Sequence, residues 1–319
     1  MSFGISRIQL EDGPATRQAF GDALVDAGSN ERVVVIDGDV NNSTYTESFA
    51  KSYPDRFFNV GIAESNLIGI AAGLAASGKI PVAASFSVFL LANAFDQIRM
   101  SVAFPNQNVK LVGTHAGISI GEDGPSQMAI EDVALACALP GFTVIVPADA
   151  PSAAAATRAM IEREGPTFLR CGRPSVPLVY QEGADFHVGK ANQVRAGDDV
   201  TIVANGIMVA MALDAAAGLA EEGIEARVLD MHTVKPVDVA ALERASNETR
   251  GIVVAEEHLA YGGLGSTCAA VLGERAPTKM AFVDLGDMYA TSGKPEELLV
   301  QFGLTPESIM DAARRVLKD

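Results

Sequence analysis

Short apolar runs alternate with helix-length segments along most of this 319-residue chain, and this alternation constrains the fold more than any other feature. A strand that is apolar at every position must be covered on both faces, and helices between such strands supply that cover. The first series has expected strands at residues 33–36, 81–85, 109–113, 143–147 and 167–170, and expected helices at 65–76, 89–103 and 152–164. This series predicts an α/β domain with a mostly parallel sheet.

The same alternation resumes after residues 173–189, a segment that contains proline and glycine. Its expected strands are 200–204, 226–230, 251–256 and 280–285, and its expected helices are 208–222, 237–246, 265–272 and 306–316. We therefore expect two successive α/β domains, residues 1–180 and 190–319, each a mostly parallel sheet with helices on both faces.

Composition excludes several classes of protein. A formal charge of −16 opposes general binding to nucleic acid, so a small anionic ligand would need a locally basic pocket. No apolar run reaches the roughly 18–20 residues of a membrane helix, and the first residues lack the pattern of a secretion signal. The three cysteines are widely spaced and suit neither a disulfide framework nor a zinc site. We expect a cytoplasmic protein that binds neither nucleic acid nor membranes.

The densest polar segment is residues 113–127, which follow an expected strand. This segment is rich in glycine and carries His115, Glu122, Asp123 and Gln127. Ligands of open parallel sheets bind at the carboxyl ends of the strands, and glycines allow a ligand to approach the backbone closely. The segment is therefore a candidate binding loop, and a solvated turn with incidental polar side chains is the alternative.

Glu64 stands at the start of a very apolar expected helix. A glutamate in the first turn of a helix commonly complements the helix dipole, and the residue alone favours this interpretation. The following helix has almost no polar face, however, which indicates burial. A buried Glu64 could instead donate a proton or a hydrogen bond to a ligand.

Aromatic and basic residues mark other strand ends. Phe86 and Phe89 lie where a strand gives way to a helix, and core packing is their default interpretation. Arg17 lies early on the first helix, residues 37–43 follow the first strand, and residues 170–173 follow the last strand of the first series. An arginine at a strand end suits phosphate recognition, and a solvated ion pair is the alternative.

Taken together, these segments resemble the pyrimidine-binding and C-terminal domains of transketolase, a thiamine-diphosphate enzyme that moves two-carbon ketol units between sugar phosphates. The resemblance assigns residues 1–180 to the pyrimidine-binding domain and 190–319 to the C-terminal domain. Similar blocks follow one another in order at residues 15–17, 37–44, 54–57, 61–66, 94–100, 121–128, 170–174, 228–236, 256–265 and 292–299.

The resemblance implies roles around the cofactor for four residues. Glu64 would be catalytic, forming a hydrogen bond with the ring nitrogen N1′ of the cofactor's aminopyrimidine. Phe89, with Phe86 beside it, would stack on the pyrimidine, and Asp39 would lie next to the cofactor. These roles would replace the helix-end interpretation of Glu64 and the core-packing interpretation of the two phenylalanines.

The resemblance also implies a substrate side. Arg17, Ser43 and Arg173 match ligands of the substrate phosphate. His115, Asp123 and Gln127 match residues that contact sugar hydroxyls. Many bacterial and fungal relatives have histidine in place of Gln127, and because glutamine cannot carry a proton, acid–base duty there would fall to His115.

One motif of full-length transketolases is missing from the chain. Those enzymes hold Mg2+ and the diphosphate through Gly-Asp-Gly and a later Asn in a preceding domain, and residues 37–39 belong to a different block. The resemblance therefore implies a split enzyme that begins here at its own Met1 and provides no metal ligand. A separate N-terminal transketolase subunit would hold the diphosphate and Mg2+, in a dimer of heterodimers.

Other functions fit parts of the pattern. The β subunit of a 2-oxo-acid dehydrogenase has similar length and domain order, and deoxyxylulose-phosphate synthase shares the chemistry. The block 121–127, the phosphate-facing Arg17, Ser43 and Arg173, and the blocks around Lys235 and Lys294 favour transketolase over the first. The second normally keeps all three domains on one chain and has a different loop after its histidine. A specialised split transketolase for a branched or sulfonated sugar phosphate also fits. The chain could instead be a paralogue without turnover, but the retained Glu64 and substrate side chains argue against that interpretation.

Overall fold

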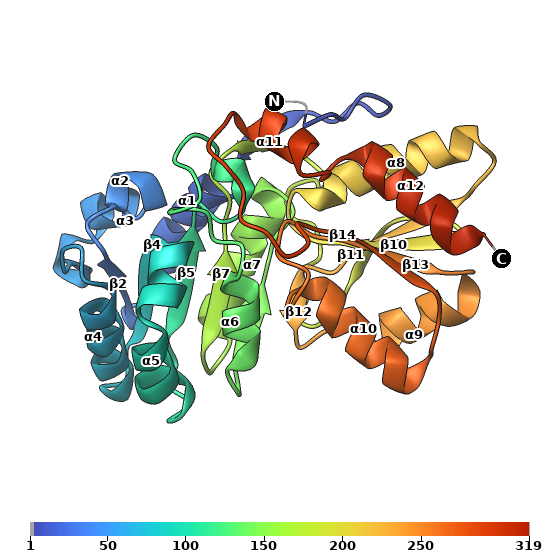
Figure 1. Ribbon diagram of the computed structural model, residues 1–319. Coiled ribbons are helices and arrows are strands. Elements are labelled where there is room, and N and C mark those ends of the chain that lie inside the picture. The colour runs from blue at the N-terminus through green and yellow to red at the C-terminus, as the bar shows by residue number, and fades with distance from the viewer. Residues whose placement is uncertain (1–2, 319) are drawn as a thin grey trace.

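A seven-stranded sheet forms the core of the first domain in this computed structural model, which describes residues 3–318, so that Met1 lies outside the described residues. The strand order is β12-β6-β7-β5-β4-β2-β3, and all neighbours are parallel except β12 and β6 (Figure 1). The strands are β2 Val33–Asp37, β3 Phe57–Asn59, β4 Ile80–Phe86, β5 Lys110–Thr114, β6 Thr143–Ile145, β7 Thr167–Arg170 and β12 Thr233–Lys235. A separate antiparallel pair joins β1 Asp12–Ala15 to β8 Ser175–Pro177.

Helices cover both faces of this sheet because its central strands are buried along their whole length. Helices α1 and α7 pack with α3 on one face, and α4, α5 and α6 cover the other. Their bounds are α1 Thr16–Ala27, α2 Asn41–Thr44, α3 Glu47–Ser52, α4 Glu64–Ala76, α5 Phe95–Gln97, α6 Asp132–Ala138 and α7 Ala150–Glu162. The helix expected at 89–103 is not a regular α-helix, because wide π-helical turns at Phe89–Asn93 and Ile98–Ala103 flank the short α5.

The second domain is built on a five-stranded sheet in the order β14-β13-β10-β11-β9, in which only β9 is antiparallel to its neighbour. Helices α8 and α12 cover one face, and α9 and α10 cover the other (Figure 1). The bounds are β9 Asn192–Arg195, β10 Val200–Ala204, α8 Met208–Glu221, β11 Ala226–Asp230, α9 Val239–Glu248, β13 Ile252–Ala255, α10 Leu264–Arg275, β14 Met280–Val283, α11 Pro295–Gln301 and α12 Pro306–Leu317. Both domains therefore have the predicted α/β architecture.

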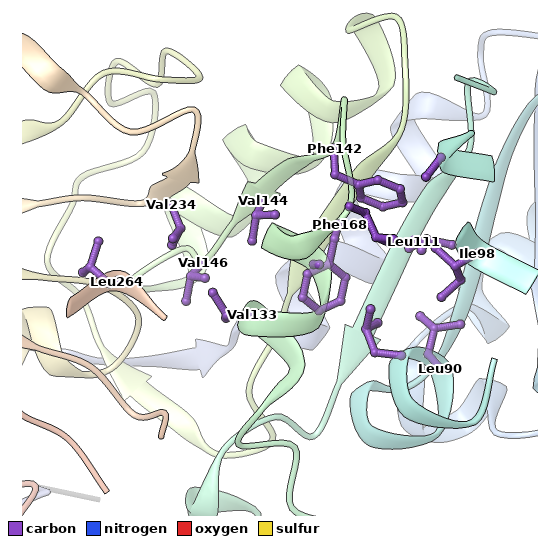
Figure 2. Packing of buried hydrophobic residues seen from close by; sticks show 14 of the residues in the cluster. Leu90, Ile98, Leu111, Val133, Phe142, Val144, Val146, Phe168, Val234 and Leu264 are labelled. Atoms are coloured by element: carbon purple, nitrogen blue, oxygen red, sulfur yellow. The ribbon is translucent and has the colours of Figure 1, made fainter. Parts of the chain in front are cut away.

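Strand β12 ties the two domains together, since it follows β11 in sequence but pairs with β6 of the first sheet. Figure 2 shows Val234 of β12 and Leu264 of α10 beside Val146, in one continuous apolar cluster. Lys235 Nζ donates to the carbonyl oxygens of Cys137 at 2.8 Å and Leu139 at 2.7 Å. The limits 1–180 and 190–319 remain a prediction. Within residues 3–318, no helix is long and apolar enough to cross a membrane.

Candidate functional site

The candidate residues gather at one edge of the first sheet, where parallel strands end together. The register pairs Asp37 of β2 with Ala84 of β4, and Phe86 of β4 with Thr114 of β5. The loops after these strands therefore start side by side, and Figure 1 shows them at the top of the first domain. This is the edge at which open parallel sheets bind ligands.

Glu64 is the first residue of α4, and its side chain is buried, with 4% of its surface exposed. Its Oε1 accepts a hydrogen bond from Ser85 Oγ at 3.1 Å, and its Oε2 accepts one from Asn93 Nδ2 at 3.3 Å. The remainder of α4 buries Leu67 and Ile68 completely. The carboxyl group of Glu64 therefore lies inside the protein, next to the end of β4. A glutamate that only complements the helix dipole would face solvent.

Three aromatic rings form a stack near the ends of β4 and β5. The ring centroids of Phe86 and Phe89 are 6.1 Å apart with planes at 12°, and those of Phe86 and His115 are 3.8 Å apart with planes at 19°. Both phenylalanines are half-buried. They therefore keep ring surface that a flat heterocycle could cover, which core packing would have removed.

Arg17 links three of the expected substrate residues. Its Nη1 donates to the carbonyl oxygen of Ser43 at 2.6 Å and lies 3.3 Å from His115 Nε2, and its Nε donates to the carbonyl oxygen of Arg173 at 3.3 Å. Because a guanidinium can only donate, Nε2 accepts and Nδ1 carries the ring proton, which it shares with Thr114 Oγ1 at 2.9 Å. Burial, and then the positive charges of Arg17 and Arg173, lower the pKa of His115 to about 3. His115 is therefore neutral at pH 7.

Arg173 connects this group to the loop after β5. Its Nη1 donates to the carbonyl oxygen of Ile120 at 2.7 Å and lies 3.6 Å from Asp123 Oδ2 and 3.8 Å from Glu122 Oε2. Gln127 is half-buried farther along the same loop, and within residues 3–318 its side chain forms no hydrogen bond with the other candidate residues. The structure thus joins Arg173 to Asp123, whereas Gln127 stands apart.

Backbone strain is concentrated in these loops. Asp39 and His115 have positive φ angles of 67° and 60°, which are uncommon for residues other than glycine. The carboxylate of Asp39 is exposed, and its Oδ1 accepts a hydrogen bond from Asn59 Nδ2 at 2.7 Å. Two predicted site residues therefore occupy backbone conformations that only the surrounding structure can maintain.

Asp37 organises the loop that carries Asp39 and Ser43, a role that we did not predict. Its carboxylate is fully buried and accepts hydrogen bonds from Val40 N at 2.7 Å and from the hydroxyl groups of Thr44 and Thr46 at 2.7 and 2.8 Å. Burial raises its pKa, and these donors oppose that rise. An aspartate that ends a strand and is followed by two threonines was the signal in the sequence.

The structure gives Arg170 neither of the two roles expected for an arginine at this strand end, which were phosphate recognition and a solvated ion pair. Its guanidinium is 7% exposed and contacts Asp132 through Nε, at 2.9 Å from Oδ2 and 3.1 Å from Oδ1. Ser87 Oγ donates to the same Asp132 carboxylate at 2.7 Å. Arg170 is therefore neither a free phosphate ligand nor part of a solvated ion pair, and it joins buried segments instead.

A groove of about 990 Å³ lies elsewhere, between α1, α7 and residues 178–183. Its lining includes the acidic residues Glu11, Asp22, Asp26 and Glu182, with Arg158 as a basic residue, and none of the candidate site residues. Such a lining repels an anionic sugar. Within residues 3–318, no group of three or more His, Cys, Asp and Glu side chains is placed to hold a metal ion.

The fold and the candidate site define the class of protein: a two-domain α/β chain with a candidate ligand site at the strand ends of its first domain. Residues 12–179 match the family model for the transketolase pyrimidine-binding domain, and residues 189–309 match the model for the transketolase C-terminal domain. The chain is 40% identical over 307 residues to a putative transketolase C-terminal section of Methanocaldococcus jannaschii, covering 95% of each chain. The chain therefore belongs to the thiamine-dependent transketolase family.

Three further similarities describe its extent within the family. It is 40% identical to the 6-deoxy-6-sulfo-D-fructose transketolase subunit SqwH of a Clostridium species, covering 94% of each chain. It is 39% identical to human transketolase but spans only 50% of that protein. A solved structure described as a split gene transketolase, an inactive beta4 tetramer, superposes with a TM-score of 0.90 and 46% identity, covering 96% of this chain and 99% of that one.

Proposed function

We propose that this chain is the C-terminal subunit of a split transketolase, which transfers a two-carbon ketol unit from a ketose phosphate to an aldose phosphate. The observation that carries the proposal is the arrangement at one sheet edge of a buried carboxyl group, a partly open aromatic stack and two arginines. The split organisation is supported by relatives of the same length, including the split gene transketolase structure.

The residues on the cofactor side fit an aminopyrimidine. Glu64 presents a buried carboxyl group that can exchange a proton or hydrogen bond with a ring nitrogen, and Ser85 and Asn93 fix its orientation. Phe86 and Phe89 offer ring surface to a flat heterocycle. Thiamine diphosphate, when bound, supplies the carbon nucleophile that carries the two-carbon unit between sugars.

The residues on the substrate side fit an anionic sugar. Arg17 and Arg173 place two guanidinium groups at the same edge, and in the proposal they bind the sugar's phosphate together with Ser43. His115 is neutral and polar, so it can orient a sugar hydroxyl without adding charge. In this proposal Asp123 and Gln127 contact other hydroxyl groups, and Asp39 lies next to the cofactor.

A partner subunit completes the site in this proposal. No metal-ligand cluster lies among residues 3–318, so Mg2+ and the diphosphate would be held mainly by a separate N-terminal subunit that carries the diphosphate-binding domain. Two such pairs would form a dimer of heterodimers in the cytoplasm.

Reconstitution tests the proposal directly. The purified chain, the candidate partner and their mixture are assayed with thiamine diphosphate, Mg2+, a ketose phosphate and an aldose phosphate. We expect ketol transfer only by the mixture, and none by either chain on its own. Transfer by the isolated chain would refute the two-chain arrangement. A mixture that transfers an acyl group to a lipoyl carrier instead would identify the alternative, a subunit of the 2-oxo-acid dehydrogenase type.

A specialised substrate is the second candidate, because SqwH is as similar to this chain as the other relatives are. SqwH is named as a subunit of a 6-deoxy-6-sulfo-D-fructose transketolase. The same reconstituted pair is therefore assayed with matched phosphorylated and sulfonated ketoses. A higher kcat/KM with the sulfonated sugar would assign this specialised activity.

A further inference from the structure

The loop that carries His115, Asp123 and Gln127 belongs to the first domain in sequence, but it packs in the core of the second. Four of its apolar side chains are at most 2% exposed, and they lie in the same cluster as residues of β10 and α11. These four are Ile118, Ile120, Met128 and Ile130. The conformation of the loop therefore depends on packing against the second domain as well as on contacts within the first.

Glu257 makes the most direct polar contact between the second domain and this loop. It follows β13, is 5% exposed, and its Oε1 accepts a hydrogen bond from Ser119 N at 2.6 Å. A methyl group added at Gly117 would lie 2.1 Å from Glu257 Cδ, so the carboxylate packs against bare backbone. Gly117 also has a φ of 81°, which favours glycine.

Two other contacts hold the same segment. Arg170 Nη2 donates to the carbonyl oxygens of Glu257 and Ala129, both at 3.0 Å. It thereby links Ala129, near the C-terminal end of the loop, to Glu257, which binds Ser119 in the middle of the loop. On the other side, a methyl group at Gly121 would lie 2.9 Å from Pro295 Cδ, at the start of α11. Figure 1 shows α11 at the top of the molecule, beside this loop.

We propose that Glu257 is a positioning residue for substrate binding. Its carboxylate fixes Ser119 N and the backbone around Gly117, and thereby places His115 and Asp123 at the sugar. This inference rests on the proposed transketolase function, and it gives the second domain a part in the active site. A shift of about 1 Å in such groups lowers activity by up to roughly 100-fold.

Glu256 supplies a matched control because it adjoins Glu257 and is equally buried, at 2% exposed. Its carboxylate accepts hydrogen bonds from Leu264 N and Gly265 N, both at 2.7 Å, at the start of α10. These contacts stay within the second domain. Removing the Glu256 carboxylate therefore shows how the loss of a buried carboxylate affects stability and activity when no contact with the loop is lost.

The kinetic experiment compares Glu257→Ala, Glu257→Gln and Glu256→Ala in the reconstituted pair. We expect Glu257→Ala to lower kcat/KM by about 100-fold, mainly through a higher KM for the sugar substrate. Glu257→Gln should restore most of this loss, because its amide oxygen can still accept from Ser119 N. Glu256→Ala should keep the wild-type KM. Wild-type kinetics in Glu257→Ala, or the same KM change in Glu256→Ala, would overturn the inference.

Hydrogen exchange in the isolated chain provides a readout that needs no turnover. We expect the Ser119 amide to exchange at least about tenfold faster in Glu257→Ala, and at the wild-type rate in Glu257→Gln and Glu256→Ala. If Glu257→Ala does not fold, Glu257→Asp withdraws the carboxylate by one methylene and should show a smaller change of the same sign. Unchanged exchange refutes positioning. If Glu257→Ala alters exchange in the isolated chain but the wild-type pair shows no ketol transfer, only the proposed function is refuted.

Discussion

Glu64→Gln separates a catalytic carboxyl group from a helix-end carboxylate. The substitution keeps the shape of the side chain, and the hydroxyl group of Ser85 can either donate or accept. The new amide can therefore turn its nitrogen toward Ser85 Oγ and keep its carbonyl oxygen for Asn93 Nδ2, preserving the contacts now at 3.1 and 3.3 Å. Only the charge and the ability to exchange a proton are lost.

The expected effects on stability and turnover differ greatly in size. Losing a carboxylate at a helix N-terminus costs about 0.3–1 kcal/mol, and retaining both hydrogen bonds adds little, so the free energy of unfolding should fall by about 1 kcal/mol or less. Removing a positioned acid–base group lowers the rate by roughly 100- to 10,000-fold. Glu64→Gln should therefore fold and assemble normally but lose most ketol transfer.

The assay measures urea unfolding of the chain and steady-state turnover of the reconstituted pair. Glu47→Gln is the matched control, since Glu47 also lies in the first turn of a helix but is exposed and pairs with Lys51 at 2.8 Å. We expect this control to lose a similar, small amount of stability and to keep full turnover. Near-normal turnover in Glu64→Gln would show that Glu64 is only a helix-end carboxylate and does not act on the cofactor.

Three further predictions concern the substrate side. The imidazole of His115 should stay neutral down to about pH 3 in the free chain, as followed by NMR, and Arg17→Gln should raise its pKa because one of the charges that lowers it is gone; an unchanged pKa would contradict this account. Because the pKa of His115 in the folded chain lies below its usual value of 6.5, the unfolded state binds the proton more strongly. The free energy of unfolding should therefore have its full value above pH 6.5 and should decrease as the pH falls toward 3. Arg173→Ala should raise KM for a phosphorylated sugar by about 10- to 100-fold with little loss of stability, because its ion pairs are half-exposed, and equal KM values would exclude phosphate binding there. Asp37→Ala should lower the free energy of unfolding by roughly 2–4 kcal/mol in urea titrations, because Val40 N and two hydroxyl groups lose a buried acceptor; a change below about 0.5 kcal/mol would contradict that role.

Most elements of both sheets could be predicted from local sequence, because fully buried strands and their covering helices are visible as apolar runs. The expected strand 167–170 matches β7 Thr167–Arg170, and 226–230 matches β11 Ala226–Asp230. Short strands were missed, among them the half-exposed β3 and β9 and the mostly buried β12, since three or four residues carry little periodicity. Strand β12 was also beyond prediction because its partner β6 lies almost 90 residues earlier in the chain.

Sequence alone also indicated that residues 37–43, the loop with His115 and residues 170–173 lie at one edge of the sheet, because residues that follow parallel strands gather at one side. It could not decide which neighbouring charge each side chain faces. Arg170, the last residue of β7, and Arg173 are three residues apart, yet one is buried against Asp132 and the other is half-exposed beside Asp123. The direction of each side chain decides this difference, and it depends on packing from distant segments.

The alternating pattern by itself determined the α/β architecture of both domains, because burial of a strand or a helix face is a property of nearby residues. Only the tertiary structure decided that the loop carrying His115 packs in the core of the other domain, with Ser119 N bound to Glu257. These two residues are 138 positions apart. Contacts of that separation arise when two whole domains pack together, and no local pattern encodes them.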